Sequence, residues 1–138
     1  DNFVLEAIDM LVKGMEDHRD EFVVVLAGYT KEMTTFLQAN SGLKSRFPNI
    51  IEFPDYTASQ LLQIANNIAQ SMDYEIADDA QNKLLNYFEK IQTNRAKNSG
   101  NGRLARNVIE EASLSQATRL MKEPNASLTL LEAKDFNL

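Results

Sequence analysis

Several residue types that build common functional sites are absent or scarce in these 138 residues. There is no cysteine, which excludes disulfides, thiolate metal ligands and cysteine nucleophiles. His18 is the only histidine, so neither a multi-histidine metal site nor a Ser-His-Asp set is credible. No apolar run is long enough to span a bilayer, and no basic leader precedes an apolar stretch at the N-terminus. We therefore expect a cytoplasmic protein with no metal site and no membrane association.

Positive charge is also in short supply. The chain has 14 Lys+Arg against 20 Asp+Glu, a net charge of −6. Proteins that bind nucleic acid non-specifically need Lys and Arg to neutralise phosphates, so this balance argues against a nucleic-acid partner. Apolar residues make up 43% of the chain, which is enough to bury a core. The chain opens at Asp1 without an initiator Met and enters helical periodicity at once, which suggests a piece of a longer protein.

Residues 1–54 have the pattern of part of an α/β domain. Apolar residues at helical spacing predict a helix over 2–17, and the charged run 16–21 that follows is expected to be a solvated loop. The run 22–27 is continuously apolar and β-branched, as in a strand buried on both faces. A second helix is expected after Thr30, and a second short strand at 50–53. Two strands cannot make a covered parallel sheet, so we expect their partners outside this chain.

Residues 55–138 are predicted to form an all-α bundle, which makes the chain mostly α overall. Thr57 to Gln60 is a capping box that opens an amphipathic helix. A second cap signal at 78–81 opens another helix. The polar, Gly-rich stretch 93–102 predicts a loop, and apolar residues from Leu104 to Leu120 predict a third helix. The tail 128–138 is expected to add an extended segment or a turn.

No motif in the chain makes a self-contained enzyme, because the phosphate-cradling loop G-x-x-x-x-G-K-[ST] is absent. Three places remain open. Thr30 follows a strand end, where ligands of open α/β sheets bind, but it is also a good helix N-cap. Arg46 stands in what reads as a loop, either at a site or simply on the surface. Arg103 and Arg106 lie in the first turn of a helix, where the helix dipole disfavours cations; they either meet an anion such as a phosphate or are solvated.

These three places stand in the order and at roughly the spacing of an AAA+ ATPase. The stretch from Glu6 to Met33 resembles the segment that follows the Walker B strand in the group of CbbX and stage V sporulation protein K. The stretch from Ser41 to Thr57 resembles the arginine-finger segment of that group. The stretch from Gly100 to Ala112 resembles its sensor-2 helix. The resemblance implies that 1–54 is the C-terminal part of the large AAA+ subdomain and that 55–138 is the helical lid.

The resemblance also implies roles for single residues. Thr30 matches sensor 1, a polar side chain that orients the attacking water, although many members have Asn there. Arg46 matches the arginine finger, which acts in trans on the ATP of a neighbouring subunit and neutralises charge on the transferred phosphoryl group. Arg103 matches the sensor-2 arginine, which reaches the γ-phosphate of its own subunit. Arg106, three residues further on, is the second choice for that role.

The same resemblance sets the expected function. The intact protein is expected to use ATP and Mg²⁺ and to remodel a protein client. It is also expected to form a homo-oligomeric ring, namely a hexamer. The P-loop and Walker B motif are absent from these 138 residues, so this chain alone is expected to hold no cofactor and to be inactive. It needs the N-terminal part of the AAA+ domain as a partner. The alternatives are a non-catalytic helical interaction or oligomerisation module derived from a lid and, disfavoured by charge, a nucleic-acid motor.

Overall fold

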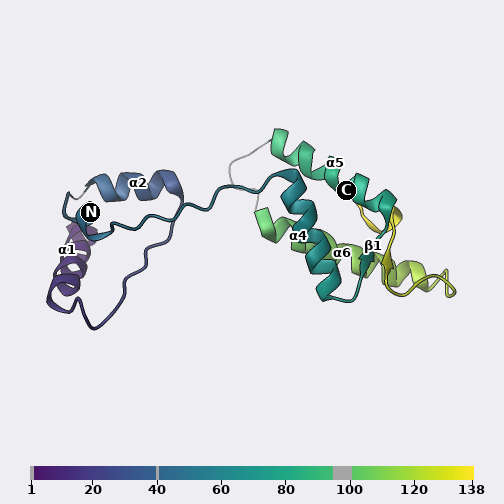
Figure 1. Cartoon of the computed structure of the whole chain (residues 1–138), viewed down its shortest axis with the longest axis horizontal. Helices are drawn as coiled ribbons and strands as arrows, with labels where there is room; N and C mark the ends of the chain where they lie inside the picture. Colours follow the sequence, from purple (N-terminus) through teal and green to yellow (C-terminus); the bar gives the residue numbers. More distant parts are fainter. Residues whose placement is uncertain (1, 40, 95–100) are drawn as a thin grey trace. The chain divides into compact units, whose positions relative to one another are not determined.

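The computed structural model describes residues 2–39, 41–94 and 101–138. The chain divides into two compact units, Asp1–Phe53 (unit 1) and Pro54–Leu138 (unit 2). Helices dominate both units, and the described strands form a single two-stranded sheet in unit 2 (Figure 1).

Unit 1 contains the helices α1 (Asn2–Asp17), α2 (Thr30–Ala39) and α3 (Ser41–Arg46). The helix predicted over 2–17 and the one expected after Thr30 are both confirmed. The short helix α3 contacts α1 and α2. Among the residues of unit 1 whose burial is described, Leu43 of α3 alone is buried. Its three helices therefore share a very small core.

The two strands predicted in unit 1 are not formed. Residues 22–29 and 47–57 carry no strand, and Figure 1 draws both segments as plain coil. Val23, Val25 and Phe53 are each more than 80% exposed. A strand needs a neighbouring strand to pair with its backbone N–H and C=O groups. The described residues of unit 1 form no such pair. The apolar composition of these runs is thus not sufficient to make a strand.

A second correction concerns the segment before Pro48, which we predicted as a loop. Residues 41–46 instead form α3, and Arg46 is the last residue of that helix. Burial of Leu43 fixes the turn, and the backbone N–H of Phe47 donates to the carbonyl of Leu43 at 3.1 Å. A short helix with one buried side chain therefore stands where a loop was predicted.

Unit 2 is a helical bundle with its own core. Helix α4 (Ala58–Ser71) packs against both α5 (Asp78–Thr93) and α6 (Asn101–Leu120). The fully buried side chains Leu84, Phe88 and Ile109 lie at the centre of this core. The remaining members are small or aliphatic for the most part: Ala58, Leu61, Ala65, Ala69, Ile76, Ala80, Ala105, Val108, Ala112, Leu131 and Phe136. The many alanines let the helices approach closely.

The start of α4 is as the sequence predicts. The hydroxyl of Thr57 accepts from the backbone N–H of Gln60 at 3.2 Å, and the Gln60 side chain accepts from the N–H of Thr57 at 2.9 Å. The start of α5 differs from the prediction: Ala77 is the N-cap and makes no side-chain cap, so Asp78 and Asp79 lie within the first turn. There their carboxylates face the positive end of the helix dipole. Most of the predicted loop 93–102 falls on residues 95–100, which lie outside the described residues.

Unit 2 also contains a sheet of two strands, each two residues long. Strand β1 (Glu75–Ile76) pairs in parallel with β2 (Leu130–Leu131), and the short 3₁₀ helix η1 (Ala133–Asp135) follows. The N–H of Glu75 donates to Thr129 at 2.8 Å. The tail was expected to be an extended segment or a turn, and it supplies both. It is thereby fastened to the segment between α4 and α5.

Candidate functional site

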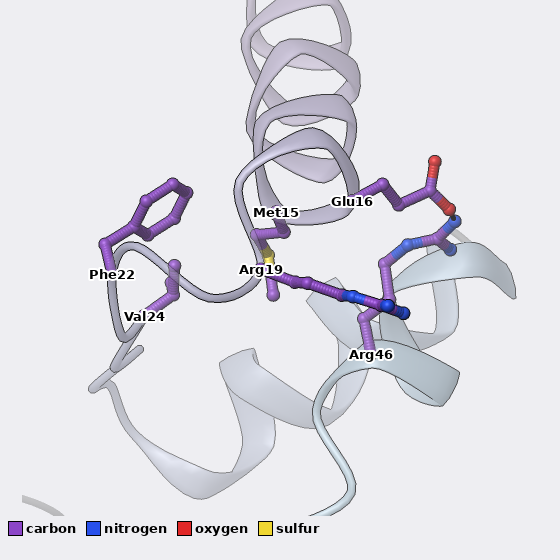
Figure 2. A pocket seen from close by; sticks show the side chains of 6 residues that line it. All are labelled: Met15, Glu16, Arg19, Phe22, Val24 and Arg46. Carbon is purple, nitrogen blue, oxygen red and sulfur yellow. Dashed lines mark hydrogen bonds and ion pairs between the residues drawn. The ribbon is translucent and has the colours of Figure 1, made fainter.

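The side chain of Arg46 bonds to its own helix, α3, and to α1. Its Nη1 donates to the carbonyl of Gly42 at 2.8 Å, and its Nη2 forms an ion pair with the carboxylate of Glu16 on α1 (Figure 2). The side chain is 27% exposed, and its Nε is buried without a hydrogen-bond partner. The guanidinium group is therefore held in place by a carboxylate while one of its donors remains unused.

A hollow of about 230 Å³ lies beside this ion pair. It is lined by Met15, Glu16, Arg19, Phe22, Val24 and Arg46. Figure 2 shows the side chain of Arg19, from the turn after α1, extending toward Arg46. The charged run 16–21, expected to be a solvated loop, is exposed throughout, but Glu16 and Asp17 belong to α1 and Glu16 contacts Arg46. No local pattern could reveal this pair, since its members are 30 residues apart.

Thr30 is the first residue of α2 and is exposed. Within the described residues its hydroxyl makes no hydrogen bond, and only its backbone carbonyl is used, as an acceptor for the hydroxyl of Thr34 at 2.7 Å. Its side chain therefore does not perform the N-cap role that was the alternative in the sequence. The hydroxyl is left available at the start of the helix.

Arg103 and Arg106 lie on the first two turns of α6 and differ in their surroundings. Arg106 is 3.8 Å from the carboxylate of Glu110, one turn further along the same helix. Both of these side chains are more than half exposed, so the pair is weak. Arg103 is exposed, and its side chain has no hydrogen bond or ion pair to any residue in the described ranges. Of the two, Arg103 has the unengaged guanidinium group.

The four predicted site residues are divided between the two units. Thr30 and Arg46 belong to unit 1, and Arg103 and Arg106 to unit 2. Across 2–39, 41–94 and 101–138, no group of His, Asp and Glu could hold a metal ion. In those same ranges, no helix is both long enough and apolar enough to cross a membrane.

Sequence reasoning missed a charged network inside unit 2. Arg119 donates two hydrogen bonds to the carboxylate of Asp135, from Nε to Oδ1 at 2.8 Å and from Nη2 to Oδ2 at 2.9 Å. Arg119 is 9% exposed and Asp135 only 2%. Nη1 of Arg119 also lies 3.1 Å from Glu132. Gln116, one turn before Arg119, donates to the carbonyls of Leu128 and Leu130.

These contacts set the charge states of the pair. The hydrogen bond to Asp135 keeps the pKa of Arg119 above its usual value. Burial raises the pKa of Asp135, but hydrogen bonds from Arg119 and from the N–H of Glu132 outweigh it, so the net shift is downward. A signal was present in the sequence: Gln116 and Arg119 continue the helical spacing of the buried Ala105, Ile109 and Ala112. Polar residues on the buried face of a helix require partners.

Comparison with known proteins identifies the fold. A family model described as the AAA lid domain matches residues 57–138, which is more than half of the chain. The chain belongs to the AAA lid domain family. The match begins at Thr57, the residue that caps α4. The lid bundle following a short N-terminal part, and the mostly α character of the chain, are thereby confirmed.

Curated relatives extend the likeness beyond the lid. Stage V sporulation protein K of Bacillus subtilis is 45% identical over 121 residues, 87% of this chain and 38% of its own length. Protein CbbX of Cereibacter sphaeroides is 37% identical, over 89% of this chain and 39% of its own. The chloroplastic ribulose bisphosphate carboxylase/oxygenase activase of Cyanidioschyzon merolae is 36% identical, over 90% and 42%. The resemblance to AAA+ ATPases of this type is confirmed, and the chain spans about two fifths of the length of these relatives.

Proposed function

We propose that this chain is the finger-bearing and lid part of an AAA+ ATPase that couples ATP hydrolysis to remodelling of a protein client. One observation carries the proposal: on a lid helix that matches the family, the guanidinium group of Arg103 has no partner in the described residues, whereas Arg106 has one. An arginine in the first turn of a helix is disfavoured by the dipole unless an anion compensates it. The γ-phosphate of ATP bound by the same subunit is that anion.

Arg46 is the arginine finger in this proposal, acting on the ATP of the next subunit in a homo-oligomeric, hexameric ring. Its carboxylate partner Glu16 supports the role, because a guanidinium held by one anion is already oriented to exchange it for another. The buried Nε of Arg46, without a partner, is a further donor for phosphate oxygens. In the transition state the finger neutralises charge that develops on the transferred phosphoryl group.

Thr30 completes the set as sensor 1. Its exposed hydroxyl, with no hydrogen bond in the described part of the chain, is able to orient the water that attacks the γ-phosphate. In this proposal the P-loop and Walker B motif of the intact protein bind ATP and Mg²⁺, and neither motif occurs in these 138 residues. The chain alone is therefore expected to be inactive. We place this activity in the cytoplasm, and because one relative is named stage V sporulation protein K, we include sporulation among the processes proposed for it.

The decisive experiment mixes two variants of the intact protein, Arg46→Ala and a substitution of the Walker B Glu. We expect Arg46→Ala to lower kcat by about 100-fold or more, as for other arginine fingers. Each variant ring is nearly inactive, but mixed rings contain some sites with a good finger from one subunit and a good Glu from the next. Activity of the mixture should exceed that of either variant.

Lys44→Ala is the matched control, because Lys44 is an exposed cation of the same helix α3. It should leave kcat nearly unchanged. If subunit exchange is demonstrated independently and mixing still restores no activity, Arg46 does not act across an interface. A natural protein without a P-loop upstream of this chain would instead favour the non-catalytic interaction module.

A further inference from the structure

The first residues of unit 2 are fastened to the start of α6 by one side chain. Nδ2 of Asn101 donates to the Asp55 carboxylate at 2.7 Å, and Oδ1 of Asn101 accepts from the backbone N–H of Tyr56 at 3.3 Å. The carbonyl of Tyr56 accepts from the side chain of Gln92 in the last turn of α5. The backbone of Tyr56 is thus held from both sides.

Asn101 occupies a particular place in the chain. It is the first residue of α6 and lies two residues before Arg103. On the other side of the contact, Asp55 and Tyr56 directly precede Thr57, the N-cap of α4. The side-chain amide of Asn101 uses its donor and its acceptor at once, which neither Asp nor Ser can reproduce in the same arrangement. It therefore joins the beginnings of two helices that are 43 residues apart in the sequence.

The contact also offsets part, but not all, of an electrostatic cost at the start of α6. Arg103 and Arg106 place positive charge at the positive end of the α6 dipole. The Asp55 carboxylate, bound to the first residue of α6, brings negative charge to that end. The first turn of a helix has N–H groups without intrahelical partners and frays readily, so fixing Asn101 limits the motion of the turn that carries Arg103.

We infer that Asn101 is a positioning residue for Arg103: by binding Asp55 and Tyr56 it orders the first turn of α6 before nucleotide arrives. This inference rests on the proposed function, since it takes Arg103 to meet a phosphate. A side chain that is ordered in advance loses less entropy when it binds. Asn101 touches neither nucleotide nor Arg103 in this scheme and acts only through the backbone of the first turn.

The first arm of the test uses the 138-residue chain and needs no nucleotide. Amide hydrogen exchange of Tyr56 is followed by NMR in the wild type, in Asn101→Ala and in Asn107→Ala. Asn107 is the matched control, an exposed Asn of α6 whose side chain makes no hydrogen bond in the described ranges. Losing one hydrogen bond should speed exchange at Tyr56 by about 2- to 10-fold in Asn101→Ala only. Unchanged exchange at Tyr56 in Asn101→Ala overturns the inference.

The second arm measures ATP hydrolysis by the intact protein as a function of Mg²⁺-ATP concentration. Asn101→Ala should raise KM for ATP by about 3- to 10-fold and change kcat by less than about twofold, because ordering is lost but no charge is removed. A merely structural role predicts equal loss of both, in step with a lower Tm, and that result contradicts the inference. If Arg103→Ala raises KM and Asn101→Ala does not, the positioning role alone is wrong. If Arg103→Ala leaves nucleotide affinity unchanged, the sensor-2 role and the inference fail together.

Discussion

Phe53 and Phe88 are the same amino acid 35 residues apart, yet Phe53 is 89% exposed and Phe88 is fully buried. The difference follows the boundary between the two units. In unit 2, α4, α5 and α6 cover one another's apolar faces and exclude water from a continuous core. In unit 1 the apolar runs 22–27 and 50–53 are mostly exposed, and only Val24 and Leu26 among them are half-buried. A helix satisfies its own backbone and needs only a neighbour for its side chains, whereas a strand needs a neighbour for both.

The largest effect should come from the core that distinguishes the units. Phe88→Ala should lower the free energy of unfolding of unit 2 by about 3–5 kcal/mol, because it removes a fully buried ring and leaves a cavity. Phe53→Ala, its exposed counterpart, should change the free energy by less than about 0.5 kcal/mol. Urea unfolding followed by circular dichroism measures both. A large loss in Phe53→Ala would show that unit 1 buries this residue after all.

Breaking the buried ion pair should have an effect of comparable size. Asp135→Ala leaves the Arg119 guanidinium buried without its two-point partner, and we expect a loss of about 3–5 kcal/mol. Replacing both residues, with Arg119→Met and Asp135→Leu, should recover much of that loss because no unpaired charge remains buried. The same urea series tests it. A double variant as unstable as Asp135→Ala would mean that the pair stabilises unit 2 beyond the cost of burying its charges.

The pair also predicts a pH dependence confined to unit 2. The pKa of Asp135 in the folded chain lies below its ordinary value of 3.8, so its stabilising contribution is fully present well above that pH. The contribution is lost as the pH falls below 3.8 and through the lowered folded value, because the unfolded chain takes up the proton first. Stability of unit 2 measured from pH 6 to pH 2 should decline less steeply in Asp135→Asn than in the wild type. Equal slopes would assign the acid sensitivity to other carboxylates.

The smallest effect concerns α1 of unit 1. A Cβ added at Gly14 meets no heavy atom within 4 Å, and Gly14 lies inside α1 without positive φ. Gly14→Ala should therefore stabilise that helix by about 0.5–1 kcal/mol through backbone entropy alone. Because unit 1 buries so little, helicity of α1 should respond directly to this change, as a gain in helical circular dichroism. Protection of amides in unit 2 should not change.

Helix positions were the most predictable feature of this chain. The spacing of apolar residues predicted α1, α4 and α6. The pattern from Thr57 to Gln60 predicted a capping box, and both of its hydrogen bonds are present in the structure. Each depends on residues within about one turn of each other, so the sequence states the interaction in full. The family resemblance could likewise be recognised from the sequence, because it depends on the order of short motifs.

Features made by residues far apart were decided only by tertiary structure. Arg46 was a candidate from the sequence, but its partner Glu16 became visible only when α1 and α3 came together. The parallel pair β1–β2 joins segments about 55 residues apart, and Arg119 meets Asp135 across the turn after α6. The runs 22–27 and 50–53 show the converse: their composition favours strands, but a ladder forms only where two segments pair, and neither run pairs within the described residues. Local hydrogen bonds and helical spacing are written in the sequence, whereas strand pairing and the neutralisation of buried charge depend on which distant segment folding brings alongside.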